Sequence, residues 1–342
     1  MKKNLKIAIS AVLMLAPLTA PSHSQEAPEA FYKGKTLTIT VGIETGTGFD
    51  LYGRALARHM GRYIPGNPNI LVSNMPGASG LIAFNWLANV APKDGTSFGI
   101  VSFSAPFEPV FGNPQARFDA TKFNWLGNMD SGATVCAVRP DSGVTNWKDV
   151  MTREVSVGAA GRAGPISQAP RALVAVGGAK LKIIEGYVGT AGVKLAIERN
   201  EVQGICGISM STMRTQYAEL LSSGRVKMIL QLGPAPDPSL TGVPHIFEFA
   251  RNDNERSLYS VIFGPQGLGR SFAAPPDVPA ARVAALRAAF AATMKDPQFL
   301  EDAKKTRLDL SPQTGEQVQA FVSKLYATPP DIVAQAKKIL GR

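Results

Sequence analysis

The sequence has little of what catalytic and metal sites usually need. Its 342 residues include two cysteines and three histidines, His23, His59 and His245. No HExxH zinc motif and no GxxxxGK[ST] phosphate loop occurs. The histidines lie far apart, and the serines of PGASG and GISMS lack the G-x-S-x-G frame of a nucleophile elbow, so no convincing Ser-His-Asp set is visible. We therefore expect neither a metal site nor a bound cofactor.

The chain also lacks a long apolar run. Beyond the N-terminal region, no stretch reaches the ~18 uncharged apolar residues of a membrane-spanning helix. Residues 1–24 have the pattern of a cleavable secretory signal, because Lys2, Lys3 and Lys6 accompany an apolar stretch and small residues follow up to Ser24. Cleavage after Ala27 is the alternative. We expect a periplasmic mature protein that lacks this signal peptide.

Basic residues are in excess but are not clustered. The formal net charge of +10 falls to +7 when the three signal lysines are removed. The remaining arginines and lysines are scattered and are not interleaved with stacking aromatics, so the sequence predicts no nucleic-acid groove. A mild positive excess instead favours long-range attraction of small anions.

Two cysteines are too few for a disulfide scaffold. Cys136 and Cys206 each lie in an apolar stretch, VCAV and GICGI. The pattern favours two buried reduced thiols, and a disulfide between neighbouring strands is the alternative, because sequence alone does not give the geometry of a bridge.

The segments that are present alternate regularly between two types. Short β-branched runs follow amphipathic helical patterns from Thr36 onward, which is typical of parallel sheets covered by helices, so we expect an α/β fold. Strands are expected at residues 36–41, 69–74, 97–103, 123–129, 133–140, 155–160, 180–187, 202–209 and 226–233. Helices are expected at residues 51–64, 81–91, 144–151, from Gly164, at 189–199, up to Ser222, and at 279–294, 297–306, 314–326 and 329–340.

Four segments, taken in order, carry a resemblance to a known family. They are VGIETGTGFDLYGRALARHM, NMPGASG with its following helix, APKDGTSFG and ALRAAFAATMKDPQF. The chain resembles the substrate-binding receptors of tripartite tricarboxylate transporters, also called Bug or TctC receptors, over roughly residues 31–340. The resemblance implies a type II periplasmic-binding-protein fold, in which two doubly wound lobes hold a ligand in the cleft between them. It places lobe I at residues 31–126 and, in a second and largely helical part, at 233–342, with lobe II at 127–232.

The same resemblance implies a function. The chain is expected to be a monomeric extracytoplasmic solute-binding receptor that captures a small organic anion, a carboxylate, for membrane transporter subunits. One alternative is a ligand-binding sensor component for a membrane signalling protein. A secreted α/β enzyme is disfavoured, because Gly46, Gly48 and Gly53 give G-x-G-x-x-x-x-G where a dinucleotide-binding turn needs G-x-G-x-x-G.

Lobe I is expected to hold a carboxylate on backbone N–H groups. Two glycine-containing loops each precede a helix, and such a junction directs N–H donors and the positive end of the helix dipole toward an anion. Glu44 departs from the family pattern and is expected to point to solvent, the alternative being a different ligand, while Asp50 is expected to cap the helix. The residues expected to bind in these loops are Thr45, Gly46, Thr47, Gly48, Phe49, Gly77, Ala78, Ser79 and Gly80.

Lobe II is expected to add specificity. Arg162 lies in a glycine-rich loop, where its guanidinium could fork onto a second acid group, the alternative being a solvated loop arginine. The segment around Ser209 lacks the aspartates of many relatives, which lowers the expectation of an amino acid as ligand. The residues expected to bind in lobe II are Gly161, Arg162, Gly164, Gly189, Thr190 and Ser209.

Overall fold

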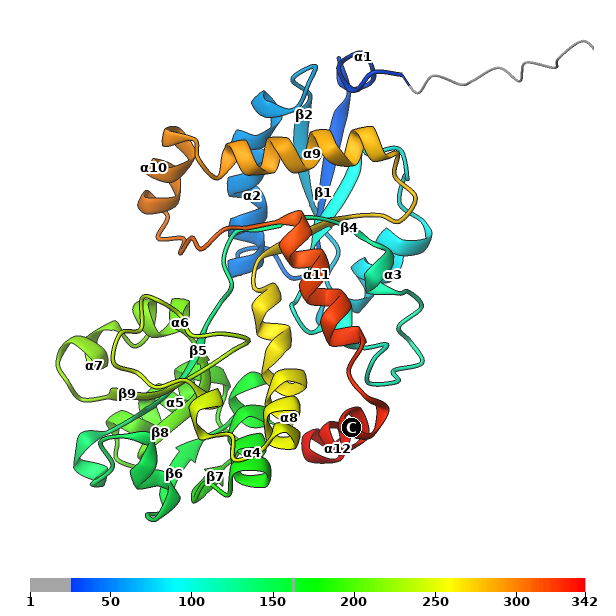
Figure 1. Ribbon diagram of the computed structural model, residues 1–342. Coiled ribbons are helices and arrows are strands. Elements are labelled where there is room, and N and C mark those ends of the chain that lie inside the picture. The colour runs from blue at the N-terminus through cyan, green and yellow to red at the C-terminus, as the bar shows by residue number, and fades with distance from the viewer. Residues whose placement is uncertain (1–25, 162–163, 342) are drawn as a thin grey trace, which may run out of the picture.

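A computed structural model describes residues 26–161 and 164–341 of the chain. The polypeptide forms two β-sheets that lie at opposite ends of the molecule, each covered by helices (Figure 1). This arrangement confirms the α/β fold with two doubly wound halves that the sequence predicted. The predicted signal peptide lies outside the described residues.

The first sheet has six strands in the order β2-β1-β3-β10-β4-β11. β1, β2 and β3 are parallel, whereas β10 runs antiparallel to both of its neighbours. Every residue of β3 is buried, whereas β2 forms an edge of the sheet and alternates between exposed and half-buried positions. The strands are β1 Thr36–Val41, β2 Asn69–Asn74, β3 Ser97–Ile100, β4 Asn124–Asn128, β10 Ser271–Ala274 and β11 Gln313–Thr314.

The second sheet repeats this order over five strands, β7-β6-β8-β5-β9. Here β5 is the antiparallel strand between β8 and β9. In each sheet the chain enters the antiparallel strand directly after leaving the other sheet. Strand β5 of the second sheet follows β4 of the first sheet, and β10 of the first sheet follows β9, the last strand of the second sheet. The strands are β5 Thr134–Val138, β6 Val155–Gly158, β7 Leu181–Ile184, β8 Gly204–Ser209 and β9 Lys227–Leu232.

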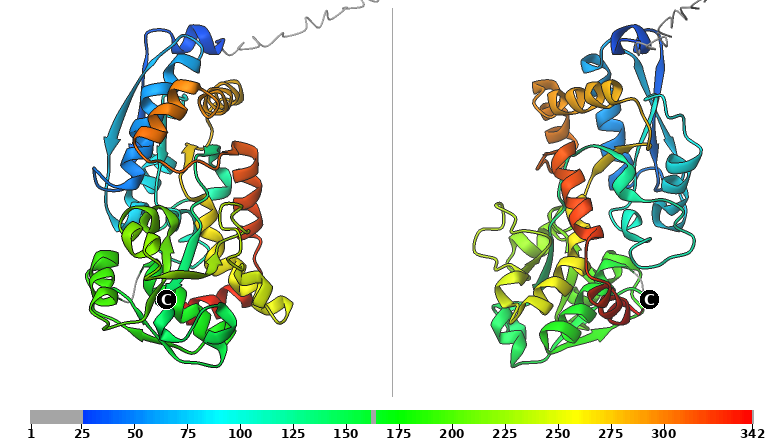
Figure 2. Two further views of the ribbon diagram at one scale, coloured as in Figure 1. Left: turned by 90° about the vertical axis from the view of Figure 1, so that its left-hand side faces the viewer. Right: turned by 45° about the vertical axis from the view of Figure 1, so that its right-hand side comes forward.

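The helices divide between the two sheets, with α8 and α11 lying between them (Figures 1 and 2). Many begin at a residue that suits a helix start: Asp296 caps α10 with its side chain, and Thr314 forms a capping box with Gln317 in α11. The helices are α1 Pro28–Tyr32, α2 Gly48–Met60, α3 Leu81–Asn89, α4 Pro165–Gly177, α5 Gly189–Glu198, α6 Met210–Thr215, α7 Ala218–Ser222, α8 Asp253–Phe263, α9 Ala280–Thr293, α10 Pro297–Lys305, α11 Gly315–Tyr326 and α12 Pro330–Leu340.

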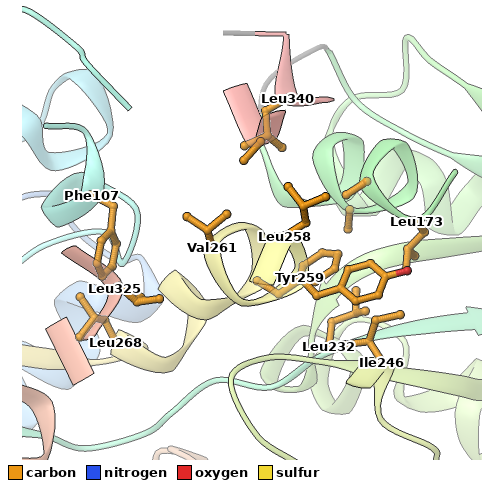
Figure 3. Packing of buried hydrophobic residues seen from close by; sticks show 14 of the residues in the cluster. Phe107, Leu173, Leu232, Ile246, Leu258, Tyr259, Val261, Leu268, Leu325 and Leu340 are labelled. Atoms are coloured by element: carbon orange, nitrogen blue, oxygen red, sulfur yellow. The ribbon is translucent and has the colours of Figure 1, made fainter. Parts of the chain in front are cut away.

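One apolar cluster joins the two halves through α8. Leu258 and Tyr259 of α8 lie in the same cluster as Leu173 of α4, Leu325 of α11 and Leu340 of α12 (Figure 3). Each fully buried side chain of this size contributes about 1.5–3 kcal/mol through removal of apolar surface from water. The C-terminal helix α12 packs on α4 and α8, so it lies beside the second sheet. The lobe boundaries inferred from the sequence stay a prediction.

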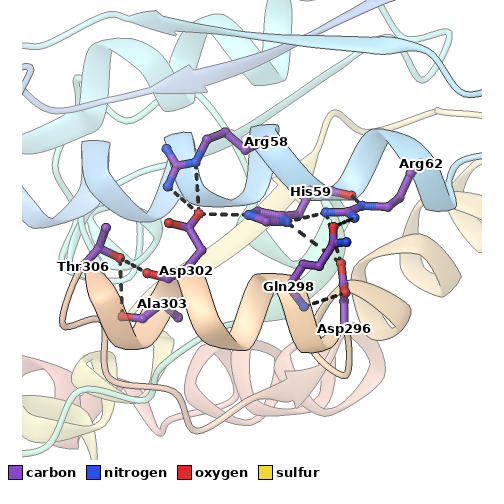
Figure 4. A network of polar contacts seen from close by, with 8 residues as sticks. All are labelled: Arg58, His59, Arg62, Asp296, Gln298, Asp302, Ala303 and Thr306. Atoms are coloured by element: carbon purple, nitrogen blue, oxygen red, sulfur yellow. Dashed lines mark hydrogen bonds and ion pairs between the residues drawn. The ribbon is translucent and has the colours of Figure 1, made fainter.

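A polar network fixes α2 against α10 (Figure 4). His59 Nε2 and Arg58 Nη2 each lie 2.8 Å from Oδ2 of Asp302, and Arg62 Nη2 lies 3.1 Å from Oδ2 of Asp296. These contacts are partly buried on the acidic side, whereas Arg58 and Arg62 remain partly exposed, and ion pairs near the surface stabilise by only about 0–1 kcal/mol each. Their joint effect is to orient α2 on the first sheet.

The two cysteines form a disulfide, so the expectation of two reduced thiols is wrong. Cys136 of β5 and Cys206 of β8 are paired across adjacent antiparallel strands, both buried, and are bonded to each other. Strand register brings together two residues that are 70 positions apart in sequence. This register could not be predicted from the sequence, because no local pattern shows which strands are neighbours in the sheet.

Three further differences concern single elements. The helix predicted to run up to Ser222 is two helices, α6 and α7, broken at Gln216 and Tyr217. The segment 144–151 forms only a short 3₁₀ helix, Trp147–Met151, which Asn146 caps. Strand β10 and helix α8 were not predicted at all, although both lie on the path of the chain back to the first sheet.

Candidate functional site

A cavity of about 500 Å³ lies between the two sheets. The first half of the molecule contributes residues from the start of α2, from the segment before β10 and from the loop before β11. The second half contributes the start of β5, the end of β8 and the starts of α4, α5 and α6. Ligands of α/β sheets commonly bind at the carboxyl ends of strands, where loops lead into helices, and this cavity occupies such a position.

Arg270 is the main cation of the cavity. Its guanidinium carbon lies 4.2 Å from the ring centroid of Phe49 and 5.2 Å from that of Tyr52, and both rings belong to α2. Nη1 donates to the carbonyl oxygen of Gly269 at 3.3 Å, whereas the buried Nε has no hydrogen-bond partner among the described residues. Burial lowers the pKa of Arg270, with nearby Tyr52 and Asp130 opposing that shift. A buried guanidinium held on two rings, without a carboxylate partner, suits an anionic ligand.

Asp130 is the second charged group that lines the cavity close to this point. Its carboxylate accepts hydrogen bonds from the Ser311 hydroxyl, at 3.2 Å, and from the backbone N–H of Gly132. Burial raises the pKa of Asp130, and the positive charge of Arg270 partly opposes the increase. Among the described residues, this half-buried carboxylate thus receives hydrogen bonds only from neutral groups.

An ion pair crosses the cavity between the two halves. Arg214 of α6 binds the carboxylate of Asp309, which lies in the loop before β11. Arg214 Nη2 also donates to the Ser239 hydroxyl at 3.1 Å, and the Tyr52 hydroxyl donates to the carbonyl oxygen of Asp309 at 2.7 Å. Both charges are partly exposed, so the pair contributes modestly to stability, but it directly joins the two halves.

Apolar side chains form much of the remaining wall. Phe49 and Phe103 come from the first half, and Ile166 and Met210 from the second. An apolar wall with a few charged groups is typical of small-molecule sites, because burial of the ligand supplies affinity and the polar groups orient it.

Five of the residues predicted from the sequence line this cavity: Phe49, Gly164, Gly189, Thr190 and Ser209. The two hydroxyl groups among them already have partners. Thr190 Oγ1 donates to Gln216 Oε1 at 2.7 Å, and Ser209 caps α6 by accepting the N–H of Thr212 at 3.2 Å. Each oxygen can still accept a further hydrogen bond from a ligand.

The first predicted loop has a partner within the chain itself. The Gly46 N–H donates to Oδ2 of Asp50 at 2.8 Å, and the same carboxylate accepts from Arg54 Nε at 2.9 Å and from Asn74 Nδ2 at 3.0 Å. These hydrogen bonds lower the pKa of Asp50 although burial alone would raise it. Thr47, rather than Asp50, occupies the N-cap position of α2, so the predicted role of Asp50 as the cap is wrong.

The second predicted loop packs against the first and away from the cavity lining. A Cβ on Gly42 would lie 3.2 Å from the Cα of Gly80, so the two loops need glycine where they touch. Four consecutive residues, 77–80, have positive φ. The predicted residues that do not line the cavity are Thr45, Gly46, Thr47, Gly48, Gly77, Ala78, Ser79, Gly80 and Gly161. Their role in binding stays a prediction.

Two other expectations concern charged loop residues. Glu44 is exposed and does not line the cavity, in agreement with an orientation toward solvent. Arg162 lies outside the described residues, so its proposed contact with an acid group stays a prediction.

Sequence reasoning missed the charged residues that do line the cavity. Arg270 stands between apolar segments, and a lone arginine in an otherwise apolar stretch was the available signal. No comparable signal marked the aspartates, because they lie in loops, where acidic residues are common. The missed residues are Asp130, Arg214, Asp237, Arg270 and Asp309.

Two further features are absent from the part of the chain that the structure describes. No group of three or more His, Cys, Asp or Glu side chains in residues 26–161 and 164–341 is arranged to hold a metal ion. Within the same residues, no helix has the length and apolar character needed to cross a membrane.

Comparisons with known proteins bear on the fold. No protein-family model matches the chain, and no curated protein matches it. Solved structures do. A TctC solute-binding protein from Polaromonas is 19% identical, with a TM-score of 0.70, over 89% of this chain and 99% of that one. An R. palustris protein with adipate is 17% identical, with a TM-score of 0.59, over 90% and 98%.

A third structure agrees with these two. MatC from Rhodopseudomonas palustris, with bound malate, is 18% identical, with a TM-score of 0.56, over 88% of this chain and 99% of that one. At this level of identity, matches that cover almost the whole of both chains show that the proteins share the same fold. The chain therefore has the two-lobed α/β fold of periplasmic solute-binding proteins.

Proposed function

We propose that this protein is an extracytoplasmic receptor that binds one small organic anion, a carboxylate, between its two halves. The observation that carries the proposal is the guanidinium of Arg270, which forms no ion pair among the described residues and is held on Phe49 and Tyr52 at the wall of a cavity between the two sheets. Burial of a cation that no carboxylate contacts directly is costly to the fold, and a ligand carboxylate offsets that cost. The proteins of similar fold that carry adipate and malate support this class of ligand.

The receptor binds without covalent chemistry. One pentapeptide, Gly95-Thr96-Ser97-Phe98-Gly99, has the form G-x-S-x-G. A nucleophile elbow follows a strand and leads into a helix, with its serine exposed, whereas Ser97 is the first residue of β3 and is 2% exposed. The charged residues at the cavity, Arg270 and Arg214 with their acidic neighbours, are groups that bind and orient a ligand.

Closure of the two halves around the ligand is the mechanism of capture. Near the cavity, residues 128–134 and residues 266–271 connect the two halves, and the Thr134 hydroxyl donates to Gln266 Oε1 at 2.8 Å between these two segments. A ligand that touches both halves shifts the equilibrium toward the closed state by its differential affinity for that state.

The partners and the location follow from the same proposal. The N-terminal signal pattern supports export to the periplasm. Membrane transporter subunits of the tripartite tricarboxylate type are the proposed recipients of the ligand, and the match to a TctC solute-binding protein supports this assignment. We propose that the receptor acts as a monomer with residues 31–126 and 233–342 forming lobe I and 127–232 forming lobe II.

A thermal-shift panel of organic acids, followed by calorimetric titration of the hits, tests the proposal. A true ligand raises the melting temperature in proportion to the logarithm of its concentration and binds with a stoichiometry of one. The ligand must be recovered unchanged after incubation, as a turnover assay checks. Conversion of the compound to a product would contradict the assignment as a receptor.

A further inference from the structure

The cavity holds two opposite charges that do not pair with each other. Arg270 and Asp130 both line it, and each influences the pKa of the other. Among the described residues, neither side chain takes part in an ion pair: Arg270 donates to the Gly269 carbonyl, and Asp130 accepts from Ser311 and Gly132. Burial opposes ionisation of both groups, so each gains from a partner of opposite charge.

The other charged residues of the lining are already matched. Arg214 and Asp309 form the ion pair that crosses the cavity. Asp237 accepts the backbone N–H of Ser239 at 2.8 Å in an exposed turn, so water screens its charge. Arg270 and Asp130 remain, as one positive and one negative charge without an ion-pair partner among the described residues.

The backbone places these two charges close together. The Arg270 N–H donates to the carbonyl oxygen of Asp130 at 2.9 Å, because the two connections between the halves run side by side there. Their side chains therefore start from neighbouring points of the cavity wall. A ligand that bridges them needs its two charged groups only a few atoms apart, as in an α-amino acid.

We infer that the ligand is a zwitterion, in which a carboxylate binds Arg270 and a cationic nitrogen on a nearby carbon binds Asp130. This inference rests on the proposed receptor function and narrows its ligand from carboxylates in general to a carboxylate whose charge is balanced by a cationic nitrogen. The remainder of the ligand is apolar and packs against Phe49, Phe103 and Met210, which line the same cavity. Asp130 supplies the acidic partner that the segment around Ser209 lacks.

The same arrangement selects against dicarboxylates. A second carboxylate near Arg270 would face Asp130, and an unfavourable charge contact is a direct way to exclude a competing ligand. A simple monocarboxylate avoids that repulsion but leaves Asp130 without a partner. We expect affinity to decrease from the amino acid to the monocarboxylate to the dicarboxylate of the same carbon skeleton.

Matched sets of three acids test this order by calorimetric titration. One set is norleucine, hexanoate and adipate, and further sets use shorter aliphatic and phenyl-bearing skeletons. The expected result is that the amino acid of the best-fitting set binds at least about tenfold more tightly than its dicarboxylate, which is the difference that one charge contact commonly makes. Tighter binding of the dicarboxylate would overturn the zwitterion inference and leave the receptor proposal standing. Absence of binding by every acid in every set would overturn both.

Two variants locate the selectivity. Asp130→Asn is nearly isosteric, and we expect it to reduce affinity for the amino acid about tenfold or more while leaving the monocarboxylate unchanged or improved. Asp237→Asn is the matched control, because it removes a half-buried acid from the same lining that is not the proposed partner of the ligand nitrogen. The melting temperature without ligand reports whether each variant folds, and Asp130→Ser provides a smaller neutral side chain if the amide is not tolerated. If Asp130→Asn and Asp130→Ser folded and both kept the full preference for the amino acid, Asp130 would not be the determinant.

Discussion

Replacement of Arg270 by Met separates ligand binding from stability. Methionine has a long unbranched side chain and can remain on the rings of Phe49 and Tyr52, now through a sulfur contact. The guanidinium is lost, and with it a charge-assisted hydrogen bond worth about 1.5–3 kcal/mol to a carboxylate, which corresponds to roughly 10- to 150-fold in Kd. We therefore expect Arg270→Met to weaken binding of every acid, whatever its second group.

The ligand-free protein should respond in the opposite direction. Arg270 is buried against aromatic rings, its Nε has no partner among the described residues, and burial lowers its pKa. Removal of such a buried cation, which forms no ion pair among the described residues, is expected to leave the free energy of unfolding unchanged or to raise it by about 1 kcal/mol. Urea unfolding of the ligand-free variant and titration with the best ligand measure the two effects. Arg199→Met, at a side chain that is 70% exposed, is the control.

The change in affinity and the change in stability of Arg270→Met must be interpreted together. Lost affinity together with lost stability would indicate that Arg270 acts only by supporting the fold. Unchanged affinity in a folded variant would refute the assignment of Arg270 as the anchor for the anion.

Three further predictions concern other parts of the structure. Arg214→Gln removes the ion pair with Asp309, which stabilises by about 0–1 kcal/mol. Small-angle scattering of the ligand-free variant should show a larger radius of gyration than that of the unaltered protein. An unchanged radius would count against a role of this pair in holding the two halves together. Replacement of Cys136 and Cys206 together by Ala should lower the free energy of unfolding by about 2–4 kcal/mol, and a reducing agent should then have no further effect. Burial lowers the pKa of His245 below its usual 6.5, so the fold favours the neutral ring. The free energy of unfolding should therefore be constant above pH 6.5 and decrease as the pH falls below that value. His245→Asn keeps a capping residue, and its urea midpoint should decline less steeply with falling pH.

Most of the fold was readable from the sequence because its strands are short β-branched runs between glycines and helix caps. Strand β1 has the predicted limits, Thr36–Val41, and β2 was also predicted to the residue. Strand β10 was not predicted because Ser271–Ala274 is four residues long and contains no β-branched residue. It is a strand because β3 and β4 leave a position between them, and tertiary pairing overrides weak local preference.

The site was less readable than the fold, and the reason is distance along the chain. Phe49 was predicted to bind because it lies in the first glycine-containing loop before a helix, and it does line the cavity. Its partner Arg270 lies more than two hundred positions away, and nothing local connects the two residues. Local patterns give loops that precede helices, but only packing decides which side chain fills the space in front of them.

The contact between Asp50 and Gly46 changes how the anion is expected to be held. Glycine-containing loops before helices favour anions through free N–H groups, yet here the chain's own carboxylate occupies the Gly46 N–H and is fixed there by Arg54 and Asn74. That carboxylate adds negative charge at the start of α2, so a ligand anion gains less from the helix end than the loop sequence suggests. Arg270 restores a positive charge nearby, since its Nη2 would lie 3.3 Å from a Cβ placed on Gly48. The cation at this site therefore comes from a side chain that reaches α2 from the segment before β10, and a selective anion site can be built there without free loop amides.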